Sequence, residues 1–309
     1  MGKLGLNSGY IGSDQRTTTN GVVGYDKYYL ERRNGRFNPV LEVTYLLDTY
    51  SGASAAYSLR KLSSTYAGSV IRVRRSSDNV EQDIGFSGVE LNTSELLSFC
   101  GVGDGFVTTW YNQSGNSRNV IQTTAANQPQ IVNSGNLITE NSKPTLQFDG
   151  INDVLTSATI SSVFSNSSMI TVLKIANQTG EDVPFGYGTA NQSSAIRVLY
   201  SSAGKKLGFA TWSNDYVSSI DTISTSLYLL SVIQNSNNIS LRKNTTTNTG
   251  NLPSIPSSTL TSAYSIGGIT GNTSYNTEMY GSEFIFYPSD QSLNRTLIET
   301  NINAYYSVY

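Results

Sequence analysis

The chain has 309 residues, of which 14% are charged, and its formal net charge at pH 7 is −2. This composition provides no basic field of the kind that nucleic-acid-binding surfaces use, so it argues against nucleic acid as a partner. The length suits one large domain, or a domain and an arm, with a core that needs no covalent or metal cross-links.

The chain contains no histidine and a single cysteine, Cys100. Ser-His-Asp and Cys-His catalysis therefore lack their base, and no intrachain disulfide or histidine zinc site can form. We expect no metal and no cofactor, and we interpret Cys100 as a small buried residue. No apolar signal-peptide core and no run of 18 apolar residues is present, so we expect synthesis in a cytoplasm and no membrane span.

Residues 1–39 differ from the rest of the chain because glycines interrupt every regular pattern. This segment nevertheless carries many large side chains for a solvated tail, among them Tyr10, Tyr25, Tyr28, Tyr29 and Phe37. We predict an arm at 1–39 that orders on a partner surface, with packing across its own domain as an equal alternative. Residues 40–309 would then form the domain.

The first half of that domain mixes strand patterns with two short helical patterns. The run 41–47 is rich in β-forming residues, 48–52 has the composition of a turn, and apolar spacing predicts a short helix within 53–66. The alternation of apolar and polar residues predicts a strand at 70–74. Ser94 is placed to cap a predicted helical turn at 94–100, and a further strand is predicted at 106–110.

The second half predicts an all-β structure closed by a short helix. Polar or glycine-rich turns separate the expected strands, which are 169–175, 195–200, 206–212, 227–234, 239–242, 264–267 and 278–287. Apolar residues then recur at helical spacing in the last segment, at Leu293, Leu297, Ile298, Ile302 and Tyr305.

Several short strings of the first half resemble the catalytic domain of the α-L-arabinofuranosidase B family. They are Ala55–Arg60, Ile71–Asn79, Asp83–Phe86, Phe99–Gly101 and Trp110–Asn116. The resemblance implies a concanavalin A-like lectin/glucanase jelly-roll sandwich, here with an extended N-terminal arm and a short C-terminal helix. The second half is also similar to the laminin-G-like branch of such sandwiches.

The same resemblance implies that the catalytic carboxylates are missing. The family's nucleophilic Glu falls on Asn191, or on Gln192 after a one-residue slip, and its acid/base Asp falls on Ile269. A retaining glycosidase needs two carboxyl groups about 5–5.5 Å apart. We therefore expect no enzyme; the alternative is an active glycoside hydrolase with relocated carboxylates. The acids nearest the two positions are Asp182, Glu278 and Glu283.

Two further groups of charged residues have a functional and a structural interpretation. Asp149 and Asp153 offer oxygen ligands for Ca²⁺, but an Asx-type turn is favoured because the spacing of a calcium loop is missing. The basic run at 72–75 suits a phosphate or acidic glycan. Ion pairs of these arginines with Asp78, Glu81 and Asp83 are favoured instead.

The motifs Arg72–Asn79 and Trp110–Asn116, with the opening Ser8–Arg16, also resemble structural proteins of tailed phages. This resemblance implies a virion protein, made in the host cytoplasm, that decorates a capsid or belongs to a head fibre or tail appendage. The arm would bind other virion proteins of capsid or tail, and we expect a homo-oligomer, with a trimer as the first choice.

The exposed sandwich would touch a host glycan or have no ligand at all. Aromatic faces that stack on sugar rings are the candidates for such contact. They lie in predicted loops or strand ends, at Trp212, Tyr187, Tyr216 and Tyr275, with ordinary packing as the alternative for each.

Overall fold

The computed structural model describes residues 44–162, 165–177, 181–189, 192–201, 204–211, 214–222, 224–254, 260–269 and 272–309. Tyr45–Tyr309 forms one compact unit. The predicted arm lies outside the described residues, as do its aromatic residues Tyr10, Tyr25, Tyr28, Tyr29 and Phe37. The domain boundary at residue 40 and the arm's role therefore stay predictions.

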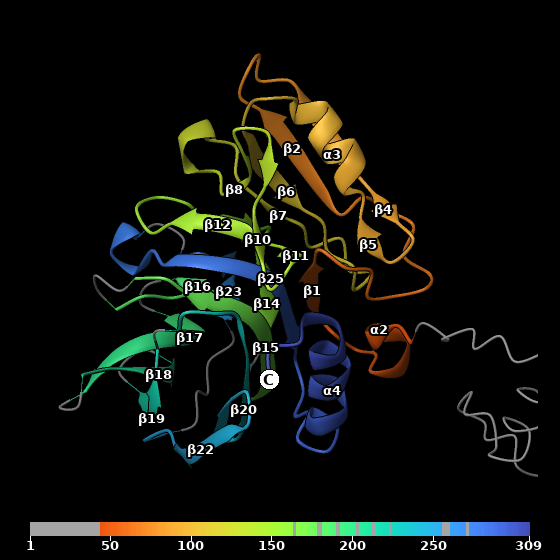
Figure 1. The fold of residues 1–309 in the computed structure, drawn as a ribbon. Coiled ribbons are helices and arrows are strands. Elements are labelled where there is room, and N and C mark those ends of the chain that lie inside the picture. The colour runs from red at the N-terminus through yellow and green to blue at the C-terminus, as the bar shows by residue number, and fades with distance from the viewer. Residues whose placement is uncertain are drawn as a thin grey trace, which may run out of the picture. The chain divides into compact units, whose positions relative to one another are not determined.

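The described chain is mostly β, and 19 of its strands join into one hydrogen-bonded network (Figure 1). The strands of the first half are β1 (Ala55–Ser58), β2 (Ile71–Arg75), β3 (Glu81–Ile84), β4 (Phe86–Ser87), β5 (Glu90–Leu91), β6 (Gly105–Trp110), β7 (Val120–Ile121), β8 (Gln130–Asn133), β9 (Asn136–Leu137), β10 (Thr139–Glu140), β11 (Lys143–Pro144) and β12 (Leu146–Asp149).

The strands of the second half are longer. They are β13 (Leu155–Ser157), β14 (Ile160–Ser162), β15 (Asn166–Ile175), β16 (Phe185–Thr189), β17 (Gln192–Ser201), β18 (Gly204–Ala210), β19 (Asp215–Asp221), β20 (Tyr228–Asn235), β21 (Asn238–Lys243), β22 (Thr246–Asn251), β23 (Leu260–Ser262), β24 (Tyr264–Ile266) and β25 (Glu278–Tyr287). The helical segments are α2 (Leu46–Thr49), α3 (Thr93–Cys100), α4 (Arg295–Tyr306) and the 3₁₀ turns η2 (Ala125–Asn127) and η3 (Thr273–Tyr275).

Strand β25 organises the middle of the molecule, because it pairs antiparallel with β1, β12 and β15. Its side chains alternate between two cores, as expected for a strand with both faces covered. Phe284 and Phe286 enter the large core between the layers of the sandwich. Ile285 and Tyr287 enter a smaller core with Ile298 of α4, which covers the outer face of the sheet.

The large core ties the β6 layer to the β25 layer through aromatic contacts. The Trp110 ring meets Phe284 edge to face, with ring centroids 5.8 Å apart and an interplanar angle of 88°. Tyr57 of β1 packs on the same Trp110 ring at 6.3 Å. The predicted mostly β sandwich with a C-terminal helix is therefore confirmed.

Two predicted elements are wrong. The helix predicted within 53–66 is not formed; residues 55–58 are strand β1 instead, and all four residues of this strand are buried between two cores. Tyr57 points to the large core and Ala56 to the small one, so neither face of the strand is polar. The β-rich run at 41–47 ends in the helical turn α2, where Leu46 and Leu47 pack in the small core.

Cys100 is buried, as predicted, at the end of α3. Burial raises the pKa of its thiol, so the thiol is neutral and unreactive at physiological pH. In the described part of the chain, no helix combines the length and the apolar character that crossing a bilayer requires.

Candidate functional site

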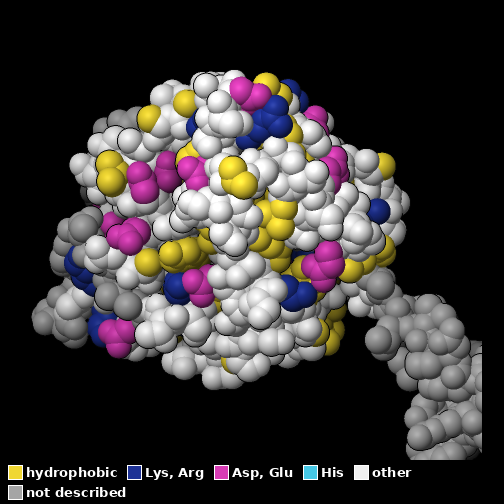
Figure 2. Space-filling view, turned by 45° about the horizontal axis from the view of Figure 1, so that its top comes forward, with side chains coloured by type: hydrophobic (Ala, Val, Ile, Leu, Met, Phe, Trp, Pro, Cys, Tyr) yellow, Lys and Arg dark blue, Asp and Glu magenta, His cyan; other side chains and the backbone are white. Residues whose placement is uncertain are grey.

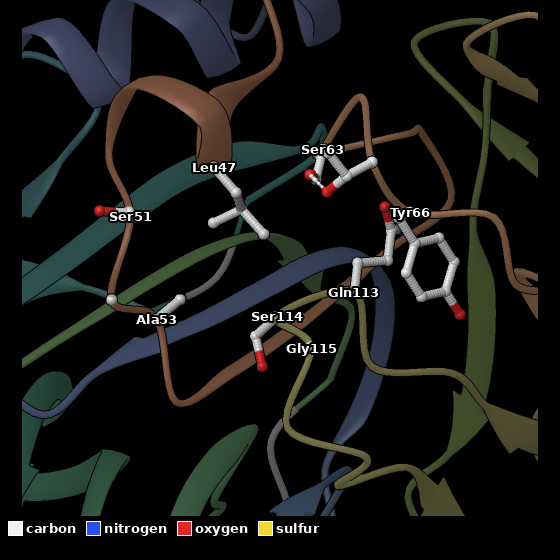
Figure 3. A pocket seen from close by; sticks show the side chains of 10 residues that line it. Leu47, Ser51, Ala53, Ser63, Tyr66, Gln113, Ser114 and Gly115 are labelled. Carbon is white, nitrogen blue, oxygen red and sulfur yellow. Dashed lines mark hydrogen bonds between the residues drawn. The ribbon is translucent and has the colours of Figure 1, made fainter.

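A hollow of about 220 Å³ opens beside the turn that follows β6, and we call it the turn pocket (Figure 3). It brings together three stretches of chain that are far apart in the sequence. Its walls are Leu47, Ser51, Gly52, Ala53, Ser63, Thr65, Tyr66, Gln113, Ser114 and Gly115. No lining residue carries a carboxyl group, so the pocket offers hydroxyl groups, one amide and one aromatic ring.

Two buried amides hold the turn in place. The Asn112 side chain accepts hydrogen bonds from the backbone N–H of Ala56, at 2.8 Å, and of Ser114, at 3.0 Å. Gln113 accepts from the Leu62 N–H at 2.8 Å, and its amide nitrogen donates to the Ser58 carbonyl at 2.9 Å. Gln113 therefore uses both of its amide atoms within the protein, and the oxygen of Asn112 fixes the turn, while the buried amide nitrogen of Asn112 has no hydrogen-bond partner.

One polar wall of the turn pocket depends on Asp48. The Ser63 hydroxyl donates to the Asp48 carboxylate at 2.8 Å and lies 3.1 Å from the Thr65 hydroxyl (Figure 3). Burial tends to raise the pKa of Asp48, but hydrogen bonds from Ser64 and Ser63 lower it below its ordinary value. The carboxylate therefore stays ionised at neutral pH and orients these hydroxyls.

Tyr66 supplies the aromatic ring of the turn pocket (Figure 3). Its hydroxyl donates to the Ser69 carbonyl at 2.8 Å, and its ring meets Phe86 edge to face with centroids 6.3 Å apart. Burial, with a smaller effect of Tyr111, raises the pKa of Tyr66 to about 12, so the phenol is neutral. The ring is half-buried, so part of its surface is accessible at the pocket.

A second hollow of about 470 Å³ shares the residues Gly52, Ala53 and Ser114 with the first, and we call it the arginine pocket. Its other lining residues are Ser54, Asn116, Arg118, Ile160 and Pro288. The two hollows therefore form neighbouring sites on one face, and only the second holds a charged side chain. A third hollow of about 300 Å³, near the β20–β21 hairpin, contains one carboxyl group, that of Asp290.

Of the two positions on which the family's catalytic carboxylates fall, Ile269 lies within the described residues. Ile269 is 3% exposed and packs with Val183, before the start of β16. Asn191 lies outside the described residues, but Thr189 and Gln192, which flank it, pair with each other at the other end of β16. The expectation that the family's nucleophile position falls on Asn191 and its acid/base position on Ile269 stays a prediction.

The relocated carboxylates do not form an accessible pair. Glu283 is fully buried, and its two oxygens bind Arg60 at 2.8 and 3.0 Å. Asp182 is 1% exposed. Glu278 is half-buried and lies opposite Asp149 in the β12–β25 ladder. Two of these three acids are thus closed to a sugar substrate.

Asp149 and Asp153 build the predicted Asx-type turn. The Asp149 carboxylate accepts hydrogen bonds from the N–H groups of Ile151 at 2.8 Å and Asn152 at 3.1 Å. Asp153 accepts from the Asp149 N–H at 3.0 Å. Burial, and then the charge of Asp149, raise the pKa of Asp153 to about 7. Within the described ranges, no cluster of three acidic or cysteine side chains has a geometry that would hold a metal ion.

The basic run on β2 forms mostly ion pairs, as predicted. Arg72 contacts Glu81 at 2.7 Å and Asp83 at 3.3 Å, and Arg75 contacts Asp78 at 2.7 Å. Arg74 differs, because its guanidinium binds neutral acceptors alone. On the face drawn in Figure 2, basic side chains lie next to acidic ones, so this face has no broad basic surface.

Two of the four predicted sugar-stacking residues are packing residues. Tyr187 is fully buried; its ring packs on Tyr264 with centroids 5.3 Å apart, and its hydroxyl donates to the Ile160 carbonyl at 2.7 Å. Tyr216 is 8% exposed and bonds to Asn248. Neither ring has a free face, so both predictions are wrong. Tyr275 is half-buried beside Ile269 and stays a candidate, while Trp212 lies outside the described residues.

The sequence analysis missed Tyr66 and Arg118. Tyr66 follows three hydroxyl residues, Ser63–Thr65, and Arg118 follows the Trp110–Asn116 motif by two positions. The sequence signal that points to these two residues is their position next to these segments. The structure adds that β1 and its flanking loops bring both side chains to one face.

Comparison with known proteins agrees with the motif resemblance in the first half of the chain. Residues 48–150 match the family model described as Alpha-L-arabinofuranosidase B, catalytic. No curated protein matches the chain. The matched range includes most of both pockets.

Solved structures of arabinofuranosidases share the fold. They include a Glu-to-Gln mutant of a GH54 α-L-arabinofuranosidase soaked with 4-nitrophenyl α-L-arabinofuranoside, with a TM-score of 0.65 and 20% identity. An arabinofuranosidase complexed with arabinofuranosyl-α-1,2-xylobiose gives 0.64 and 19%. A GH54 enzyme soaked with a cyclic sulfate inhibitor gives 0.62 and 20%. Each comparison covers 84% of this chain but 64% of the solved chain.

Proposed function

We propose that the chain is a non-enzymatic virion protein whose sandwich binds a carbohydrate at the turn pocket. The observation that carries the proposal is the lining of this pocket, in which hydroxyl groups and the Tyr66 ring surround a small hollow without a carboxyl group. Such walls suit recognition of one sugar ring by stacking and hydrogen bonds. The fold shared with arabinofuranosidases supports a carbohydrate as the ligand.

The absence of hydrolysis follows from the chemistry that the pocket lacks. Glycoside hydrolysis needs one carboxyl group as acid and a second as nucleophile or base, both within reach of the same bond. Neither the turn pocket nor the arginine pocket has a carboxyl group in its lining. Binding without turnover is the function that such a site supports.

Display on a phage particle is the second part of the proposal. It is supported by the resemblance of Ser8–Arg16, Arg72–Asn79 and Trp110–Asn116 to tailed-phage structural proteins. In this proposal residues 1–39 attach to other virion proteins, and the sandwich faces outward toward host glycans. The assembly is a homo-oligomer, with a trimer as the first choice.

A glycoside hydrolase is the alternative, and two observations favour it. Residues 48–150 match a catalytic family, and the solved structures of similar fold are arabinofuranosidases. In addition, Asp149 and Asp153 lie in one turn, where burial and then the charge of Asp149 raise the pKa of Asp153 to about 7. A carboxyl group whose pKa is raised toward neutral pH by burial is suited to act as a general acid.

Calorimetric titration of the full chain with arabinan and xylan oligosaccharides, followed by an aryl α-L-arabinofuranoside assay, separates the two functions. We expect binding without turnover, and a loss of affinity of roughly tenfold or more in Tyr66→Ala, because a stacked ring is removed. Tyr309→Ala is the matched control, since Tyr309 is 45% exposed and lies outside the pocket lining. Turnover that disappears in Asp153→Asn would establish the hydrolase instead.

A further inference from the structure

Arg118 carries a charge that no acid in its own domain neutralises. Every Asp and Glu after Glu42 lies in the described ranges, and none of them forms an ion pair with Arg118. The other arginines with described side chains pair with carboxylates, except Arg74. Arg118 is therefore one of two candidates for binding an external anion.

Its guanidinium is fixed to the wall of the arginine pocket from one side. Nη1 donates to the Ser54 carbonyl at 3.3 Å and also to the Ser54 hydroxyl, which in turn lies 2.7 Å from the Tyr264 hydroxyl. The Tyr57 hydroxyl donates to the Arg118 carbonyl at 2.5 Å, which fixes the backbone as well. The neighbouring phenols are neutral, so they orient the cation without balancing its charge.

The guanidinium also has the Tyr264 hydroxyl as a hydrogen-bonding neighbour, but the bonds with a defined geometry all use Nη1. Nε and Nη2 are not among the buried polar atoms without a partner. Arg74 has the opposite arrangement: its Nε donates to Gln128 at 2.8 Å, Nη1 to Asn79 at 2.8 Å and Nη2 to the Ala125 carbonyl at 3.2 Å. Among the arginines with described side chains, Arg118 is the one that combines a charge without an ion pair with donors left over at a hollow.

We propose that the arginine pocket binds the carboxylate of an acidic saccharide, such as a uronic acid residue. A guanidinium fork matches the two oxygens of a carboxylate, and charge-assisted bonds of this kind are the strong ones. The pocket contains about 470 Å³ and no lining acid that would repel the anion. It shares Gly52, Ala53 and Ser114 with the turn pocket, so an adjoining sugar ring of the same chain lies against Tyr66. This inference rests on the proposed carbohydrate binding and specifies its ligand class.

The test is titration of the full-length protein with trigalacturonate, its methyl ester, and a sulfated galactose oligosaccharide of equal length. We expect trigalacturonate to bind at least roughly tenfold more tightly than the methyl ester, because the ester removes the charge. Arg118→Gln should abolish this preference and Arg118→Lys should reduce it, since lysine keeps the charge but loses the fork. Arg74→Gln is the matched control and should leave the preference unchanged.

Equal binding of the acid and the ester by the native protein would overturn the inference. This comparison needs no variant, so a folding defect of Arg118→Gln cannot obscure the result. Tighter binding of the sulfated sugar would overturn the carboxylate assignment. If neutral oligosaccharides bind through Tyr66 while the preference for uronate is absent, the inference fails and the proposed function stands. If no saccharide binds, both fail.

Discussion

At the scale of single residues, Asp153 is the titratable group with the clearest consequence for stability. Its side chain is 6% exposed, and its pKa rises from 3.8 to about 7 because of burial and then the charge of Asp149. The native state therefore holds a proton that the unfolded chain releases at a lower pH. Stability from this group is complete below about pH 4, falls as pH rises toward 7, and stays low above it.

We predict that Asp153→Asn stabilises the protein at pH 8 and has little effect near pH 4. An amide oxygen still accepts the Asp149 N–H bond, while the cost of a buried carboxylate is removed. The expected gain at pH 8 is on the order of 1–4 kcal/mol, which is the pKa shift converted at about 1.4 kcal/mol per pH unit. Urea unfolding of both proteins at pH 4, 6 and 8 measures it, and a gain independent of pH would contradict the explanation.

At the scale of elements, one buried ion pair joins β1, β25 and α4. Glu283 of β25 binds the Arg60 guanidinium through both oxygens and accepts from the Ser58 hydroxyl at 2.7 Å. Arg60 also donates to Asn301 of α4 at 2.9 Å, and its guanidinium carbon lies 5.1 Å from the centroid of the Tyr305 ring. Burial opposes the charged form of Arg60, yet Glu283 keeps the pKa of the guanidinium above its ordinary value.

Replacing one partner of this pair should be more damaging than replacing both. Glu283→Gln leaves Arg60 buried without its counter-charge, and we expect a loss of about 3–5 kcal/mol in the free energy of unfolding. The double replacement Arg60→Met with Glu283→Met removes both charges and should lose less than Glu283→Gln alone. A double-mutant cycle by urea unfolding gives both values, and additive losses would argue against direct coupling of the two charges.

The sequence predicts elements well where one face of a strand is apolar or where a long apolar run is bounded by turns. The predicted strand 278–287 has the bounds of β25, and the closing helix is α4. It fails where tertiary contacts cover both faces of a strand, as in β1, because all four residues are buried and no alternation of apolar and polar residues marks the strand. It also misplaced the cap of α3, because Asn92, not Ser94, accepts the Glu95 N–H.

The site could not be predicted from the sequence in the same way, because it is a property of the whole sandwich. The pockets of Tyr66 and Arg118 adjoin at Ser114, because β25 holds β1 and its loops next to the turn after β6. Tyr187 was chosen as a loop aromatic, yet pairing of β16 with β24 and β17 places it in the core. The sequence identifies these side chains, whereas their exposure depends on strand pairings between segments that are distant in the chain, such as β1 with β25.

For the whole molecule, the compactness of Tyr45–Tyr309 leads to a prediction about residues 1–39. Both hydrophobic cores and the ion pair of Arg60 with Glu283 lie within this unit, so residues 40–309 should unfold cooperatively and at nearly the temperature of the full chain.

Burial of the arm's tyrosines in a contact between chains would contribute roughly 1.5–3 kcal/mol for each ring. The full chain should therefore sediment as an oligomer, the truncated chain as a monomer, and Tyr28→Ser with Tyr29→Ser should weaken assembly without lowering the melting temperature. A truncated chain that melts without cooperativity would place the arm in the core, and a monomeric full chain at tens of micromolar would leave docking on other virion proteins as the arm's role.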